Sequence, residues 1–183
     1  MNQPVRPLTL SSLFAALLAM SAFIRIPAGP VPLTLQAPMV LLAGYCLGPR
    51  HGVYATLLYT AVGLMGLPVF ASGGGPAYVL SPTFGYIIGF SFCAFLIGML
   101  ARLNRSGSAL TAYLLMVIAL AGIYIPGLLW LALSMHWIAA VPRTVTALLQ
   151  AGLLLPLAGN LLTAIPAALI AVRLQKRMRP RTE

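Results

Sequence analysis

Few side chains in this sequence could carry out acid–base, nucleophilic or metal chemistry. The one acidic residue is Glu183, and the one lysine is Lys176. The two histidines, His51 and His136, have no Cys, Asp or Glu partner that would complete a metal site. A Ser-His-Asp constellation needs an acid that the chain lacks. We therefore expect a protein that is not an enzyme, with no metal and no cofactor.

The sequence also lacks the residues that would power transport. It has no GxxxxGK[ST] phosphate-binding loop, so we do not expect it to hydrolyse ATP by itself. No carboxylate lies inside an apolar run, although proton- or sodium-coupled carriers usually need one there. If the chain transports a solute, another protein must supply the energy.

Composition indicates an integral membrane protein. Of the 183 residues, 61% are hydrophobic and 7% are charged, against about 25% charged in soluble domains. The net charge of +10 does not indicate a nucleic-acid partner, because no polar face accompanies it. Cys46 and Cys93 lie inside apolar runs and are expected to pack rather than to form a disulfide.

The gaps between charged residues predict six transmembrane helices in an all-α fold. The expected spans are residues 8–24, 33–47, 52–66, 83–101, 109–133 and 148–172. The second is short and contains Pro38, which could tilt or break it. We expect one transmembrane domain over residues 1–183, with no separate soluble domain.

Basic residues predict the orientation of the chain in the cell membrane. With a cytoplasmic N-terminus, nine basic residues face inside and two, Arg25 and Arg143, face outside. This bias places both termini in the cytoplasm. Residues 173–183 then form a basic cytoplasmic tail, which we expect to lie against an anionic leaflet of the lipid bilayer.

Small residues four positions apart recur and allow helices to approach closely. The pairs are Ala15 and Ala19 (continued by Ala22), Gly44 and Gly48, and Gly85 and Gly89. They either pack within the protein or, for the alanines, face another protein. A further feature is the uncharged segment 67–82, which holds three successive glycines. We expect a mobile outer loop in which Phe70 and Tyr78 could cover a ligand.

Three ordered motifs resemble one known family. They are Pro30-Val-Pro-Leu-Thr-Leu-Gln36, the stretch from Gly44 through Leu47-Gly-Pro-Arg50 and Tyr59 to Gly66-Leu-Pro-Val-Phe70, and Ser81-Pro-Thr-Phe-Gly-Tyr-Ile-Ile-Gly-Phe90. Together they resemble BioY, the biotin-binding S component of energy-coupling factor (ECF) transporters, over about residues 8–172.

The resemblance implies a six-helix membrane protein that binds a vitamin from outside. A transmembrane coupling protein and two cytoplasmic ATPases would supply the energy, and the S component would topple in the membrane to release its ligand. The family meets its coupling protein through small residues of the first span. In this sequence these residues are Ala15, Ala16, Ala19 and Ala22.

The last span departs from the family pattern. BioY proteins usually carry PGDxxK there, whereas this chain has Asn160 and Thr163 at the positions of the aspartate and the lysine. Losing both charges together leaves neither one buried and unpaired. The change nevertheless leaves open whether the ligand is biotin itself, a biotin precursor or another small carboxylated vitamin.

A biotin site needs acceptors for the ureido N–H groups, an apolar aromatic wall and a cation for the carboxylate. Asn160 can accept from one ureido N–H and donate to the carbonyl, or it can bond between helices. The other candidates on the outer side are Tyr86, Gln36, Thr34, Thr83, Phe70 and Thr163. Tyr86 could instead be an interfacial aromatic, and Thr83 could instead cap its helix.

For the carboxylate, the expected outer cations are Arg25 and Arg143, since an arginine fork binds a carboxylate with two hydrogen bonds. Each could alternatively contact lipid headgroups. The leading hypothesis is thus a biotin-capture subunit of an ATP-driven transporter. A membrane enzyme or a structural membrane subunit is the alternative from a different class.

Overall fold

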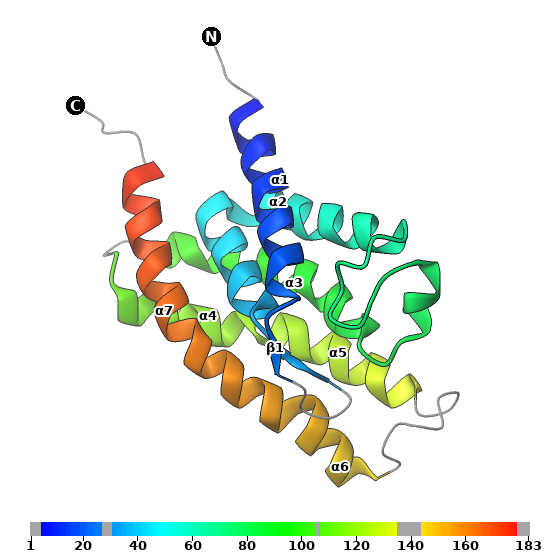
Figure 1. Cartoon of the computed structure of the whole chain (residues 1–183). Coiled ribbons are helices and arrows are strands. Elements are labelled where there is room, and N and C mark those ends of the chain that lie inside the picture. The colour runs from blue at the N-terminus through cyan, green and yellow to red at the C-terminus, as the bar shows by residue number, and fades with distance from the viewer. Residues whose placement is uncertain (1–4, 27–30, 105–106, 135–143, 179–183) are drawn as a thin grey trace, which may run out of the picture.

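The structure is a computed structural model that describes residues 5–26, 31–104, 107–134 and 144–178. It is a helical bundle with one very short β-ribbon (Figure 1). The α-helices are α1 (Val5–Ser21), α2 (Gln36–Leu64), α3 (Phe84–Leu100), α4 (Ala109–Ala119), α5 (Ala121–Ser134), α6 (Val145–Leu149) and α7 (Leu155–Met178). The remaining elements are β1 (Arg25–Ile26), β2 (Leu33–Thr34), the 3-10 turns η1 (Pro76–Leu80) and η2 (Ala101–Leu103), and the π-helical turn η3 (Gln150–Leu154).

Helix α2 bends sharply at Gly48. The φ and ψ angles of Gly48 are 81° and 178°, a region open essentially to glycine alone. Pro49 then starts the second half of the helix, a position where its missing N–H costs nothing. The bend separates the second and third expected spans. Gly48 thus makes the turn and also lies against Gly98 of α3. Pro38, in the first turn of α2, does not break the helix, contrary to one of the two expectations for it.

The other helices follow the expected spans with small differences. Helix α3 lies within one residue of the expected 83–101, whereas the last span starts earlier, at Val145, and ends at Met178. Three described stretches are long and apolar enough to cross a membrane, namely Phe84–Leu103, Ala109–Ser134 and Gln150–Gln175. A shorter apolar helix covers Pro7–Ser21. The total of six spans remains a prediction.

The β-ribbon was not predicted from the sequence. Arg25 pairs with Thr34 and Ile26 with Leu33 in an antiparallel register. Because Leu33 and Thr34 belong to this ribbon, the second helix begins at Gln36 and not at residue 33. The ribbon brings Arg25 next to the start of α2.

Glycines allow the central helices to pack closely. A Cβ at Gly89 would lie 2.7 Å from the carbonyl oxygen of Ile123, and one at Gly85 would lie 2.6 Å from that of Pro126. Gly44 likewise packs against the backbone of α3 at Ala94. These three glycines therefore pack within the protein, as one of the two interpretations of the small-residue pairs predicted. They bring α2, α3 and α5 together around the core.

The two ends of the bundle differ. The described start of α1 and the end of α7 lie at the same end of the molecule, at the top of Figure 1, whereas β1 and α6 lie toward the other end. Large apolar side chains remain exposed on the outside, among them Leu110, Leu129 and Leu162, which are 68%, 63% and 69% exposed. A surface of this kind suits contact with lipid chains.

Candidate functional site

A cavity opens among β2, the first turns of α2, α3 and α7, and the middle of the bundle. Its volume is about 60 Å³, well below the range of about 300–1,000 Å³ typical of small-molecule sites, so the side chains around it must move apart to admit a small molecule. The residues around it are Val31, Pro32, Leu33, Thr34, Gln36, Ala37, Ala71, Tyr78, Thr83, Tyr86, Ile87, Phe90, Ile123, Tyr124, Pro156 and Asn160.

Asn160 lies on α7 with its side chain at the cavity. It is 8% exposed, and its Nδ2 donates a hydrogen bond to the hydroxyl of Tyr124 at 2.8 Å. In this arrangement Nδ2 faces the Tyr124 hydroxyl on α5, and no described side chain donates to Oδ1. Asn160 thus bonds between helices and also faces the cavity, so the two interpretations of this residue are compatible.

Tyr86 and Tyr124 form an aromatic corner of the cavity. Their ring centroids are 6.2 Å apart at an interplanar angle of 88°, the edge-to-face geometry that aromatic pairs favour. The Tyr86 hydroxyl donates to the carbonyl of Gly152 at 2.8 Å, within the π-helical turn η3. Since Tyr86 is 6% exposed, it is a buried residue of the cavity wall and not an interfacial aromatic.

Gln36 and Thr34 form a polar chain that leads away from the cavity. The Thr34 hydroxyl donates to Oε1 of Gln36 at 3.0 Å, and Nε2 of Gln36 donates to the Tyr59 hydroxyl. The Tyr59 hydroxyl in turn donates to the carbonyl of Val69 at 3.1 Å. Val69 belongs to the segment 67–82, so this chain connects the cavity to the loop that was expected to cover a ligand.

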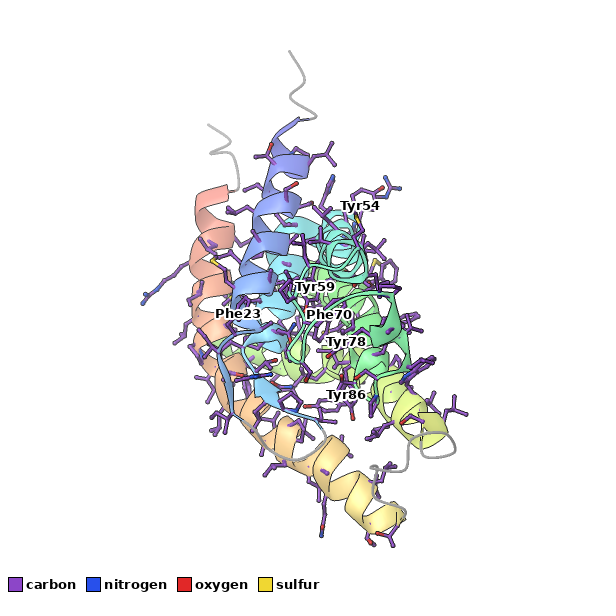
Figure 2. The ribbon with its side chains drawn as sticks, turned by 45° about the vertical axis from the view of Figure 1, so that its right-hand side comes forward. Phe23, Tyr54, Tyr59, Phe70, Tyr78 and Tyr86 are labelled. Atoms are coloured by element: carbon purple, nitrogen blue, oxygen red, sulfur yellow. The ribbon has the colours of Figure 1, made fainter. Side chains whose placement is uncertain are left out.

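The segment 67–82 packs over the cavity through aromatic side chains. Phe70 is 3% exposed and contacts Tyr78 and Tyr59, with centroid distances of 4.6 and 5.4 Å. Figure 2 shows Tyr59, Phe70, Tyr78 and Tyr86 following one another through the middle of the molecule. Tyr78 lines the cavity, whereas Phe70 lies behind it. Phe70 therefore helps to hold the segment 67–82 in place over the cavity and is not part of the cavity wall.

Thr83 lines the cavity and does not cap α3 with its side chain. Its hydroxyl is within 3.0 Å of the Tyr78 hydroxyl and 2.9 Å of the Ser81 hydroxyl. The indole Nε1 of Trp130 holds the same stretch by donating to the carbonyl of Ser81 at 3.0 Å. The end of the loop is thus fixed to α5, and its Tyr78 and Thr83 line the cavity.

The remaining candidates lie around the cavity or beyond it. Arg25 is exposed, and its guanidinium donates to the carbonyl of Ala71, a residue at the cavity. The Thr163 hydroxyl donates to the carbonyl of Gly159 at 3.0 Å and does not line the cavity. Arg143 lies outside the described residues.

Electrostatically the cavity is neutral. No charged side chain lines it among the described residues. No buried polar side-chain atom in this part of the chain lacks a hydrogen-bond partner. A ligand that binds here could donate to Oδ1 of Asn160, use the second lone pairs of the other groups or exchange partners with them.

The expected partner-binding alanines divide between core and surface. Ala15 and Ala22 are 7% and 2% exposed, whereas Ala16 is exposed and Ala19 is half-buried. A shallow groove runs between α1 and the second half of α2. It is lined by Ser12, Ala15, Ala16, Ala19, Leu58, Tyr59 and Val62.

The main omission from the sequence analysis is Tyr124. It bonds Asn160 and lines the cavity, yet in the sequence it is only a tyrosine within an apolar run. A tyrosine in the middle of such a run needs a buried hydrogen-bond partner, and that was the available signal. Phe90 was quoted as part of a motif but not as a site residue, and Pro156 was not singled out.

Comparison with known proteins decides the family. The profile of the BioY family matches residues 1–180. The chain belongs to the BioY family. As a BioY protein it is an integral membrane protein, and the expectation that it is not an enzyme is confirmed because its relatives are transporters.

Two relatives and one solved structure illustrate the match. A probable biotin transporter BioY of Lysinibacillus sphaericus is 38% identical over 97% of this chain and 91% of its own length. The biotin transporter BioY of Thermotoga maritima is 40% identical over 94% of this chain and 97% of its own. A crystal structure of the S-component for biotin from an ECF-type ABC transporter superposes with a TM-score of 0.81 at 30% identity, covering 96% of this chain and 93% of that one.

Proposed function

We propose that this protein is a biotin-specific S component that captures biotin from outside the cell membrane. The observation that carries the proposal is the cavity itself, where the amides of Gln36 and Asn160 and several hydroxyl-bearing residues meet aromatic rings, with no charged side chain among the described lining residues. Biotin combines a ureido group with an apolar thioether ring, and such a neutral, partly aromatic cavity suits that part of the molecule.

In this proposal the ureido group binds beside the side-chain amide of Asn160. Oδ1 of Asn160 accepts one ureido N–H, while Tyr124 holds the amide of Asn160 in that orientation. The thioether ring packs against Tyr86 and Phe90, which line the cavity. Sulfur close to an aromatic ring adds a small favourable contact.

The carboxylate of biotin lies toward the cavity mouth. A neutral interior cannot hold a carboxylate without a large desolvation cost. Arg25 is the described cation next to the mouth, through its bond to Ala71. Arg143 is the second candidate from the sequence. Either guanidinium would hold the carboxylate while leaving it partly in water.

The segment 67–82 acts as the cover in this proposal. Its Val69 carbonyl is bound to Tyr59, and Tyr59 is bound to Gln36 beside the cavity. A ligand that engages Gln36 would thus favour the closed position of the cover. The cavity then faces outward, with six spans and both termini in the cytoplasm.

Transport requires partners that the chain lacks. We propose a transmembrane coupling protein and two cytoplasmic ATPases, since the chain has no phosphate-binding loop. The groove lined by Ala15, Ala16 and Ala19 offers a surface of small side chains to a helix of the coupling protein. Co-purification of the chain with such an ATPase module, and biotin uptake that depends on it, would test this half of the proposal.

Ligand identity is tested by competition. Desthiobiotin keeps the ureido group and the carboxylate, whereas lipoate keeps a sulfur ring and the carboxylate but has no ureido group. If Asn160 and its neighbours recognise the ureido group, desthiobiotin displaces labelled biotin and lipoate does not. Preferential binding of desthiobiotin over biotin would favour the second candidate, a biotin precursor, which the exchange of two charges for Asn160 and Thr163 motivates.

A further inference from the structure

A second hollow lies at the other end of the molecule from the candidate cavity. Along α3 and η2, sixteen residues separate Tyr86 of the cavity from Arg102 of this hollow, or about 24 Å of helix. Along α7, Gln175 lies at the hollow and Asn160 at the cavity. The two sites are therefore distinct.

Its walls come from three helices that meet at the bend of α2. Gly48 and Pro49 of the bend lie against Gly98 of α3 so closely that a Cβ on Gly98 would lie 2.6 Å from the Cα of Pro49. The hollow has a volume of about 580 Å³ and includes Arg50, His51, Arg102 and Gln175 among its lining residues. Two guanidiniums from different helices thus face one space.

Neither guanidinium has a counter-charge among the residues that the structure describes. Arg50 and Arg102 have no hydrogen bond or ion pair with another described residue. The sequence contains one acidic side chain, Glu183. Two like charges around one hollow repel each other unless an anion lies between them. The described residues include no acidic side chain, so none of them can supply that anion.

The surroundings of the hollow indicate the source of that anion. Leu103, Met99 and Tyr54, which neighbour the two arginines in sequence or on the same helix, are 66%, 45% and 50% exposed. Arg50 and Arg102 are themselves exposed, and two cations beside exposed apolar side chains match a lipid, which carries a phosphate above acyl chains. Arginine forks bind phosphate oxygens with two hydrogen bonds each.

We propose that this hollow binds a phosphate group, that of an anionic phospholipid headgroup, between Arg50 and Arg102. His51 and Gln175 supply further hydrogen-bond donors at its edge. The site holds the bend of α2, the end of α3 and the end of α7 around one anion. It is independent of the vitamin-binding proposal.

The test uses the whole protein purified in detergent and incubated with phosphatidylglycerol or phosphatidylcholine. Retained lipid is measured by native mass spectrometry. We expect one phosphatidylglycerol to be retained in preference to phosphatidylcholine, and the Arg50→Gln/Arg102→Gln variant to retain it roughly tenfold less strongly. The matched control is Arg173→Gln, which removes an exposed arginine of α7 that does not line the hollow.

The melting temperature in phosphatidylcholine shows whether the variants fold. If the double variant does not fold, the two single variants are tested in its place. Equal retention of both lipids, or equal loss in the double variant and in Arg173→Gln, would overturn the proposal. Adding glycerol 3-phosphate separates the sources: displacement of the lipid indicates that the phosphate group alone is recognised, and retention indicates a lipid site.

Discussion

Asn160 of α7 donates a hydrogen bond of 2.8 Å from its side-chain amide to the hydroxyl of Tyr124 on α5. Both residues line the same cavity. The bond points the amide oxygen of Asn160 away from Tyr124 and makes it available to a donor in the cavity. Tyr124 is in this sense a positioning residue for the proposed ureido contact.

Replacing Tyr124 with Phe should weaken biotin binding while preserving the fold. The change leaves a buried N–H of Asn160 unpaired, which lowers stability by about 1–3 kcal/mol. Binding weakens because the amide of Asn160 is no longer held with its oxygen toward the ligand. Isothermal titration would show the loss as a larger Kd. Tyr113→Phe is the control, because Tyr113 is half-buried on α4 and does not line the cavity. Equal affinities of wild type and Tyr124→Phe for biotin would contradict the role of Tyr124 in positioning Asn160.

Restoring the aspartate of the BioY pattern at position 160 should destabilise this protein when done alone. Asn160 is 8% exposed and no charged side chain lines its cavity among the described residues. An unpaired buried charge costs about 3–5 kcal/mol. Asn160→Asp should therefore lower the melting temperature in detergent.

Adding Thr163→Lys to Asn160→Asp should recover much of that loss, because residues three apart share a helix face. The order of melting temperatures is the readout: wild type highest, the double variant next, Asn160→Asp lowest. A double variant no more stable than Asn160→Asp would show that the two positions do not interact.

The hydroxyl of Tyr59 should stabilise the cover of the cavity. It accepts from Gln36 and donates to the carbonyl of Val69 in the segment 67–82. Tyr59→Phe removes both bonds, each contributing about 0.5–1.5 kcal/mol. Ligand release, measured by stopped flow, should become faster. Tyr54→Phe on the same helix half, where Tyr54 is 50% exposed, should leave the rate unchanged; equal acceleration by both variants would contradict the assignment.

An arginine near the mouth should recognise the biotin carboxylate. Arg25→Gln or Arg143→Gln, or the two together, should weaken biotin binding by about tenfold or more, since a charge-assisted contact contributes about 1.5–3 kcal/mol. Biotin amide, which has no carboxylate, should bind wild type and variants alike. If biotin also binds every variant like wild type, neither arginine meets the carboxylate.

Much of the cavity could be predicted because its polar residues lie within apolar runs. Asn160, Tyr86, Gln36, Thr34 and Thr83 stand out by residue type, and the structure brings all five to one cavity. Polar side chains in such runs need partners, so they tend to gather. The helices were predictable for a related reason, since the gaps between charges reflect the cost of placing charge in a bilayer.

Other features have no distinct signature in the sequence. Gly44 and Gly48 have the spacing of a packing pair, yet Gly48 turns the chain because Pro49 follows it. Thr163 shares a helix face with Asn160, but its hydroxyl bonds the carbonyl of Gly159, as threonine hydroxyls commonly do within helices. Strands of two residues, such as β1 and β2, are too short to show a period.

The central claim is that the cavity around Asn160 binds biotin. Equilibrium binding of biotin to the purified protein, beside the Asn160→Ala variant, tests it most directly. We predict saturable binding that the variant weakens at least about tenfold, or about 1.4 kcal/mol, while a cooperative melting transition shows that the variant still folds. Saturable binding that Asn160→Ala leaves unaltered would contradict the ureido contact, and no saturable binding of biotin to the wild type would contradict the proposed function.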